Sequence, residues 1–285
     1  MTRLRDVLDQ HIGHPASDGA GVRLTRVIGG PGLERFDPFL MLDQFDTQNP
    51  DDYIAGFPDH PHRGFETVTY MLEGRMRHRD HLGNEGLLKP GGVQWMTAAH
   101  GIIHSEMPEQ QAGAMRGFQL WLNLPGKAKL SPAGYRDIEP EDVPRTRTAE
   151  GVEVTVIAGT FDDGQQRVDG AVQRPDTEPQ YFDLALPAAG SVQLNLPAGH
   201  RVMLYVYEGS LSVDGERSSE VGHNRLVRLG DGDAVRLHSA SGARVLVLAG
   251  RPLNEPIVQY GPFVMNSREE IEQALRDYRD GVLAL

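Results

Sequence analysis

Six of the 11 histidines in this 285-residue chain fall within one window of 45 residues. The most informative element of this cluster is His60-Pro61-His62, because residues two apart on an extended strand point to the same face. Two imidazoles on one face of a strand can bind a single metal ion from the inside of a β-barrel. Pro61 has no backbone N–H to donate, which suits the edge or the entry of a strand. This pair therefore predicts a metal site at the mouth of a barrel.

A second pair with the same spacing, His104 and Glu106, follows the strand-like segment 93–97 and a short turn. A hairpin partner strand would bring this second pair opposite the first. Three neutral imidazoles and one carboxylate suit a divalent iron, manganese, nickel, copper or zinc ion, with room for water or a substrate. The chain contains no cysteine, so any metal must be held by nitrogen and oxygen atoms.

Glu66 competes with Glu106 for the role of carboxylate ligand. It lies four residues after His62, which by parity is the same strand face, and spacing alone does not choose between the two carboxylates. His100 lies in the turn, where its role stays open. The remaining histidines are expected to be structural: His78 and His81 on a charged, solvated hairpin, and His11, His14, His200, His223 and His238 without partners at ligand spacing.

A weak internal repeat indicates two similar β units. The segment Tyr70-Met-Leu-Glu-Gly74 recurs as Tyr205-Val-Tyr-Glu-Gly209, and each copy ends a strand-like run at a Glu-Gly turn. The 33 glycines and 19 prolines favour short strands joined by many turns. A charged, proline-rich stretch separates the two copies, so we expect one domain over residues 1–135 and a second over residues 136–285.

The C-terminus carries the pattern of a helix over residues 268–280. Ser267 and Glu270 have the spacing of a capping box, and Gly281 suits the C-terminal cap. One face of this helix collects four side chains at helical spacing: Ile271, Ala274, Leu275 and Tyr278. We expect the helix to pack against a barrel.

The charge of the chain bears on its partners and its location. The net charge is −12, which repels a phosphate backbone, and the basic segment 75–79 is interpreted as an exposed strand face. The first ten residues contain two aspartates and lack the apolar core of a signal peptide. The longest apolar run, 245–249, is far shorter than a membrane span. We therefore expect a cytoplasmic monomer that binds neither nucleic acid nor a membrane.

Longer strings around these residues resemble the pirin family. The string His60-Pro-His-Arg-Gly-Phe-Glu-Thr-Val-Thr-Tyr70 is similar to the first metal motif of that family, and segments 94–98 and 101–108 are similar to the second. The likeness continues in segments 37–40, 117–125 and 255–266 and runs from about residue 20 to the C-terminal helix. Strings of this length are much more specific than an isolated His-x-His.

The resemblance implies an all-β fold, a bicupin. Two cupin-type antiparallel β-barrels of the RmlC-like jelly-roll type would face each other, with a metal ion in the N-terminal barrel and a helix at the C-terminus. By the family pattern the ligands are His60, His62, His104 and Glu106, and Glu66 would lie behind them. His100 departs from the pattern, because the family more often has an arginine or a small residue there.

The second barrel is expected to lack a metal site. In the first barrel, each ligand lies a fixed number of residues from a glycine turn. The same numbers of residues, counted from the matching turns of the second barrel, lead to residues of other types. These residues are Asn195, Pro197, Arg244 and Leu246. None of them reproduces the histidine or carboxylate of the first barrel, so we expect a structural role for the second barrel.

The resemblance also implies an activity, quercetin 2,3-dioxygenase. Such an enzyme opens a flavonol with dioxygen and releases carbon monoxide, and Glu106 would take the proton of the flavonol hydroxyl. Fe(II) is the first expectation for the metal, with Mn, Ni, Cu, Zn or Co as alternatives. Phe57, Phe65 and Trp95 are candidates for the apolar wall of the substrate pocket. The competing hypothesis is a metal-binding regulatory or redox-sensing module that acts through a protein partner rather than as an enzyme.

Overall fold

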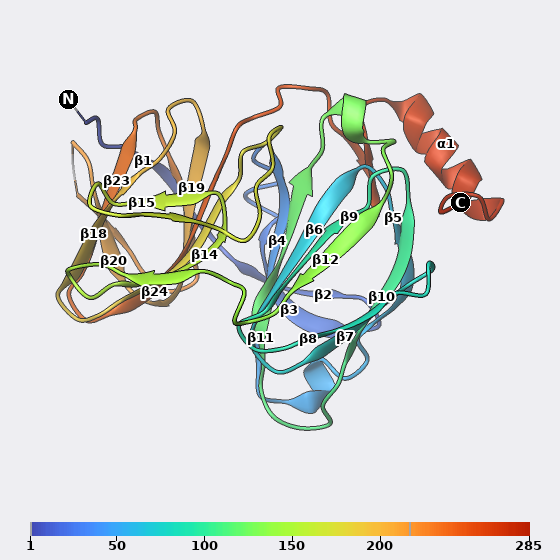
Figure 1. Ribbon diagram of the computed structural model, residues 1–285, viewed down its shortest axis with the longest axis horizontal. Helices are drawn as coiled ribbons and strands as arrows, with labels where there is room; N and C mark the ends of the chain where they lie inside the picture. The colour runs from blue at the N-terminus through green and yellow to red at the C-terminus, as the bar shows by residue number, and fades with distance from the viewer. Residues whose placement is uncertain (1, 217) are drawn as a thin grey trace. The chain divides into compact units, whose positions relative to one another are not determined.

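The computed structural model describes residues 2–216 and 218–285, which form two compact units (Figure 1). The unit that contains the histidine cluster comprises His14–Glu141 and Leu253–Leu285 and is called the histidine unit. The other comprises Met1–Gly13 and Asp142–Pro252 and is called the aliphatic unit. The domain division expected at residue 135 stays a prediction. The compact units differ from it at the ends of the chain, because the N-terminal segment belongs to the aliphatic unit and the C-terminal segment belongs to the histidine unit.

The histidine unit is built from two antiparallel sheets. A seven-stranded sheet has the order β12-β9-β6-β11-β4-β3-β2, and a four-stranded sheet has the order β5-β10-β7-β8. The larger sheet consists of β2 (His14–Asp18), β3 (Val22–Ile28), β4 (Phe39–Thr47), β6 (Phe65–Glu73), β9 (Val93–Thr97), β11 (Met115–Asn123) and β12 (Gly134–Ile138). The smaller sheet consists of β5 (Phe57–His62), β7 (Met76–Asp80), β8 (Glu85–Leu88) and β10 (Ile102–Pro108). Two short 3-10 helices, Pro50–Asp52 and Gly126–Ala128, complete the connections.

The core of the histidine unit brings together apolar side chains from both sheets. Phe45 and Met71 come from the larger sheet, and Phe57 and Met76 come from the smaller one. Each strand alternates inward and outward residues, so one face of each sheet is available for this core. Four of the six clustered histidines, His60, His62, His78 and His104, lie on the same smaller sheet, so part of the barrel interior is not apolar.

The aliphatic unit repeats this architecture with the same strand order. Its sheets are β1-β22-β19-β24-β17-β14-β13 and β18-β23-β20-β21, next to a small β15-β16 hairpin. The larger sheet consists of β1 (Val7–Ile12), β13 (Arg145–Arg147), β14 (Glu153–Ala158), β17 (Gln180–Leu186), β19 (Arg201–Gly209), β22 (Arg225–Leu229) and β24 (Ala243–Gly250). The others are β15 (Thr160–Asp162), β16 (Arg167–Asp169), β18 (Gly190–Asn195), β20 (Leu211–Asp214), β21 (Ser219–Val221) and β23 (Ala234–Ser239). The two repeat copies lie on β6 and β19, the third strand of each larger sheet, which confirms two similar β units.

The pairing of the outermost strands explains why the units differ from a simple division of the chain. Strand β1, from the N-terminus, pairs with β22 of the aliphatic unit. Strand β12 pairs with β9 at the corresponding place in the histidine unit. Short sequence patterns do not reveal such long-range pairing, because a strand's own residues do not identify the distant strand that pairs with it.

The C-terminal segment belongs to the histidine unit. It contains β25 (Val258–Tyr260), β26 (Phe263–Met265) and α1 (Arg268–Arg279), so the predicted helix is confirmed. Ser267 Oγ accepts a hydrogen bond from the Glu270 N–H at 3.2 Å, and the Glu270 carboxylate accepts one from the Ser267 N–H at 3.0 Å. Ile271 and Ala274 are buried against β26, whereas Leu275 and Tyr278 stay partly exposed. The part of the chain that the structure describes contains no helix with the length and apolarity needed to cross a membrane.

Candidate metal centre

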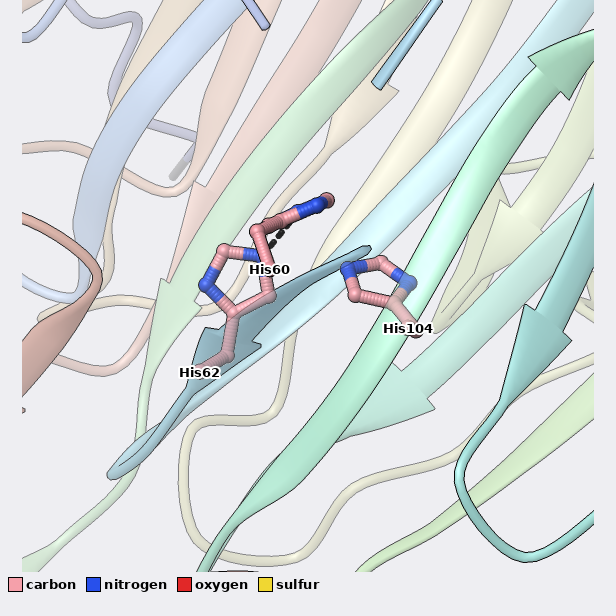
Figure 2. A group of neighbouring side chains, drawn as sticks. All are labelled: His60, His62 and His104. Atoms are coloured by element: carbon pink, nitrogen blue, oxygen red, sulfur yellow. Dashed lines mark hydrogen bonds between the residues drawn. The ribbon is translucent and has the colours of Figure 1, made fainter. Parts of the chain in front are cut away.

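The three predicted histidine ligands meet at the edge of the smaller sheet. Strand β5 lies at this edge and pairs with β10, which places His104 directly opposite His60, as expected, whereas Glu106 lies opposite Phe57 rather than His62. His60 and His62 project from β5 and His104 from β10, with their rings turned toward one another (Figure 2). One nitrogen from each of the three rings lies within 4.8 Å of the others. The three side chains could therefore hold a metal ion.

Hydrogen bonds leave the right nitrogens available for a metal. His60 Nδ1 lies 2.8 Å from the Pro58 carbonyl oxygen, an acceptor, so this nitrogen carries the proton and Nε2 keeps its lone pair. That Nε2 lies 3.0 Å from His62 Nε2. His104 Nε2 is buried and has no hydrogen-bond partner among the described residues. A buried acceptor without a partner is costly, and a metal ion would remove this cost, so the residues fit a divalent metal.

Electrostatics favour the neutral state that metal binding requires. Burial lowers the pKa of His62 well below its usual value, and the neighbouring His60 adds to this effect, while the Pro262 carbonyl opposes it. Burial likewise lowers the pKa of His104, supported by the surrounding imidazoles. A neutral imidazole offers a lone pair without prior loss of a proton. Both side chains are therefore ready to bind a cation at neutral pH.

Glu106 lies beside this cluster and is held by two donors. The β5–β10 register shifts between His104 and Glu106, so the carboxylate does not simply continue the histidine row. Its Oε1 accepts a hydrogen bond from Thr69 Oγ1 at 3.0 Å, and its Oε2 accepts one from Gln119 Nε2 at 2.8 Å. Each carboxylate oxygen has a further lone pair. Coordination by Glu106 stays a prediction that this arrangement permits.

Glu66 does not share a strand with the histidine pair, so that expectation was wrong. Strand β5 ends at His62, and Glu66 lies on β6 in the other sheet, where it accepts a hydrogen bond from Thr97 at 2.6 Å. The chain turns at Gly64, which has a φ of +93°. A Cβ atom at Gly64 would lie 1.9 Å from the Val264 carbonyl oxygen, so only glycine fits this turn. The rule that residues an even number apart share a face holds only within one strand, so it does not apply across this turn.

His78 is the functional candidate that the sequence interpretation missed. It was assigned to a solvated hairpin, but its side chain is buried and its Nε2 lies 2.9 Å from His104 Nδ1. The neighbouring Arg77 and Arg79 do lie on the outer face, where both pair with Glu85. The available signal was the two-residue period, which puts Met76, His78 and Asp80 on one face. The charged neighbours obscured it.

The other two histidines of the cluster lie apart from the metal candidates. His81 is exposed, as expected, and its Nδ1 accepts a hydrogen bond from the Ile103 N–H at 3.3 Å. His100 Nδ1 lies 3.2 Å from the Ser131 carbonyl oxygen. Its own carbonyl accepts a hydrogen bond from the Arg63 side chain. His100 therefore serves the packing of loops around the site.

A cavity of about 800 Å³ opens beside His60 and His62. Its wall contains apolar side chains, Leu40, Met41, Phe57 and Trp121, and also charged ones: Asp18, Arg26, Glu34, Arg35 and Asp59. The Trp121 ring lies 5.2 Å from the His62 ring and 4.3 Å from the Phe65 ring, measured between ring centres. Of the three wall residues expected, Phe57 lines the cavity, while Phe65 and Trp95 are buried outside its described lining. Trp121 is the aromatic wall residue that the sequence interpretation missed.

Strand pairing identifies the residues of the aliphatic unit that occupy the positions of the metal ligands in the histidine unit. These residues are not the ones predicted by counting from the glycine turns. Val235 on β23 lies opposite Leu194 on β18, as His104 lies opposite His60. Counting from the turn led instead to Arg244 and Leu246 on β24, a strand that occupies the place of β11.

The other positions of the aliphatic unit that match the polar cluster are also not the residues reached by counting. Val213 and Leu237 face each other on β20 and β23, as His78 and Glu106 do on β7 and β10. Asn195 ends β18, and Pro197 lies beyond it. The count failed because the loops of the two units differ in length.

Comparison with known proteins identifies the family to which this chain belongs. The pirin family model matches residues 21–122, and the model of the pirin C-terminal cupin domain matches residues 181–284. A pirin-like protein of Caulobacter vibrioides is 50% identical over 278 residues, which covers 98% of this chain and 99% of the relative. The chain belongs to the pirin family. Its two antiparallel barrels are accordingly the two cupin domains of a pirin, which confirms the expected bicupin fold.

Two further pirin relatives carry names that mention an activity. A Pseudomonas aeruginosa protein provisionally named quercetin 2,3-dioxygenase is 80% identical over all 285 residues of both chains. A crystal structure of quercetin 2,3-dioxygenase from Acinetobacter baumannii is 31% identical, covers 98% of each chain and superimposes with a TM-score of 0.86.

Proposed function

We propose that this pirin is a metal-dependent dioxygenase that opens a flavonol such as quercetin with dioxygen and releases carbon monoxide. The observation that carries the proposal is the position of His60 and His62 at the wall of a cavity with apolar sides. A volume of about 800 Å³ suits a flat aromatic molecule of this class. The names of the Pseudomonas and Acinetobacter proteins support the same activity.

His60, His62, His104 and Glu106 would hold the metal ion. When bound, a divalent cation supplies Lewis acidity that stabilises the anion of the flavonol 3-hydroxyl. Fe(II) is our first candidate, with Mn, Ni, Cu, Zn or Co as alternatives. The choice among these depends on geometry, ligand type and metal supply rather than on affinity alone.

Glu106 would act as the base in the reaction. A carboxylate oxygen takes the proton of the 3-hydroxyl, which raises the electron density of the ring that dioxygen attacks. Thr69 and Gln119 hold the two carboxylate oxygens and thereby fix the direction of the free lone pairs. Both oxygen atoms of dioxygen enter the product, and one ring carbon leaves as carbon monoxide.

The apolar wall would orient the substrate and exclude water. Trp121 offers a rigid aromatic edge beside His62, and Met41 offers an adaptable apolar contact. Gln119 lines the cavity and also binds Glu106, so it connects the substrate pocket to the proposed base. The apolar side chains would contact the flat faces and edges of the ring, while the polar groups of the wall would bind its hydroxyls.

The test is an aerobic assay of the purified protein loaded separately with Fe, Mn, Ni, Cu, Zn and Co. Loss of quercetin together with release of carbon monoxide is expected for at least one metal. The His62→Ala variant, treated in the same way, is expected to be inactive. Tight metal binding without turnover for any metal would contradict the proposal. It would favour instead a regulatory or redox-sensing module that acts through a protein partner.

A further inference from the structure

A fourth histidine, His78, contacts the candidate metal centre from behind. It lies on β7, where it pairs with Glu106 of β10, and its side chain is buried. Its Nε2 lies 2.9 Å from Nδ1 of His104, and its ring centre lies 4.9 Å from that of Tyr135. None of the roles proposed above uses this side chain.

The contact determines which nitrogen of His104 can bind a metal. A neutral imidazole carries one proton, so a lone pair at Nε2 requires the proton to be on Nδ1. That Nδ1–H must then donate to His78 Nε2, and His78 in turn carries its own proton on Nδ1. His104 Nε2, the atom without a hydrogen-bond partner among the described residues, is left free to bind the metal.

The tautomer of His60 is fixed in the same way, but by a different hydrogen-bond acceptor. There the Pro58 carbonyl accepts from Nδ1 at 2.8 Å and leaves Nε2 free. A backbone carbonyl can only accept, whereas an imidazole can exchange its donor and acceptor nitrogens. His78 Nδ1 is buried and has no hydrogen-bond partner among the described residues, so the contact with His104 and the packing of the ring must keep the pair in place. The close packing of its buried ring against Tyr135 restricts ring rotation and so keeps His78 Nε2, rather than a ring carbon, facing His104 Nδ1.

We propose that His78 is a positioning residue that fixes the Nδ1–H tautomer of His104 and aims His104 Nε2 at the metal. The inference rests on the proposed metal site, but it does not depend on the reaction that the metal serves. Partners behind the ligands of this kind usually change metal affinity by about 10- to 100-fold.

The first experiment measures the tautomer in the metal-free protein. Nitrogen-15 histidine NMR spectra are recorded for the wild type and for His78→Asn, His78→Gln and His81→Asn. The glutamine amide can reach the position of the lost Nε2, whereas the shorter asparagine amide cannot. We expect the Nδ1–H form of His104 in the wild type, in His78→Gln and in the exposed control His81→Asn. We expect a mixture of tautomers in His78→Asn.

The second experiment measures zinc affinity by competition with a chelator, without any assay of turnover. We expect His78→Asn to bind zinc about 10- to 100-fold more weakly, and His78→Gln and His81→Asn to stay within about threefold of the wild type. Equal losses in His78→Asn and His78→Gln would overturn the proposal, because they would indicate a role in packing or direct coordination. Unchanged zinc affinity and an unchanged tautomer in His78→Asn would also overturn it.

The two experiments separate this inference from the proposed function. A protein that binds zinc through His104 but never consumes quercetin would refute the dioxygenase and leave the role of His78 intact. Circular dichroism of each variant checks that the barrel is folded. Where His78→Asn folds poorly, a loss of zinc affinity of tenfold or more in folded His78→Gln would still overturn the proposal.

Discussion

In the histidine unit, His104 on β10 lies opposite His60 on β5, and Glu106 on the same strand lies opposite His78 on β7. His60 and His104 converge with His62 on one candidate metal position, and His78 contacts His104 from behind. Three of the four side chains are fully buried, and His60 is partly exposed beside the cavity. His104 Nε2 is buried without a hydrogen-bond partner among the described residues, and a metal ion is a group that would satisfy it.

In the aliphatic unit, the same pairing pattern places Val235 opposite Leu194 and Leu237 opposite Val213. All four side chains are buried within one continuous apolar cluster. Leucine and valine provide no metal ligand, but each gains stability from the removal of apolar surface from water. Two similar sheet arrangements thus carry a cluster of polar side chains in one barrel and an apolar core in the other, so what each barrel can bind depends on its side chains rather than on the fold.

The largest effect is expected for Glu106→Gln, which neutralises the one carboxylate among the four polar positions. The amide keeps the shape of the side chain but cannot take a proton, so quercetin turnover per bound metal ion should fall by about 10²- to 10⁴-fold. The measurement is kcat together with metal content. The matched control is Glu66→Gln, a buried carboxylate on β6 that should retain activity. Full turnover in Glu106→Gln would remove this residue as the base.

The next effect is expected in the aliphatic barrel, for Leu237→Ala. Loss of a buried leucine leaves a cavity and should lower the free energy of unfolding by about 2–5 kcal/mol. Metal content per folded chain should not change, because this position contributes only to packing. Chemical denaturation and elemental analysis of the same sample test both parts. Metal loss from the folded variant would show that the two barrels do not divide the roles as described.

A smaller, pH-dependent effect on the free energy of unfolding is expected from Lys129. This lysine is a buried charged residue of the histidine unit outside the metal site. Its Nζ donates to the Gly64 and Val264 carbonyls at 2.7 and 3.0 Å and to Asn123 Oδ1 at 2.6 Å. Burial lowers the pKa of Lys129 from 10.5 to about 8, although nearby carboxylates oppose this. Between these two values the unfolded chain binds more protons at this position than the folded chain. Stability should therefore rise with pH across that window, by at most about 3 kcal/mol.

The test of this effect compares the wild type with Lys129→Met at about pH 8 and about pH 10. The difference in the free energy of unfolding should move in favour of the wild type as the pH rises, because methionine does not titrate. Lys127→Met removes a neighbouring exposed lysine and should show no such trend. A difference that stays constant with pH for Lys129→Met would contradict the prediction.

Local spacing was enough to predict the centre of the site but not its surroundings. The two-residue period of strands identified His60, His62 and His104, since side-chain direction on one strand is a local property. The same rule failed for Glu66, because the turn at Gly64 moves the chain into another sheet. Which strand faces which depends on contacts between distant segments, and a short motif does not contain that information.

The fold shows the same limit. The repeated Glu-Gly turns predicted two β units, and the capping box predicted the terminal helix, because both signals are local. The pairing of β1 with the aliphatic unit and the attachment of α1 to the histidine unit depend on distant partners. Arg63, for example, bonds to Asp277 at 2.6 Å across more than 200 residues of chain. His78 and Trp121 became functional candidates only when such long-range contacts placed them beside the site.

The central claim is that the histidines of one barrel hold a metal ion. The most direct measurement is the metal content per folded chain, determined by elemental analysis of the wild type and of His62→Ala after identical loading and desalting. We predict about one divalent ion per wild-type chain and less than about a tenth of that in the variant, because the loss leaves two imidazoles where three converge. Full metal occupancy in His62→Ala would contradict the claim.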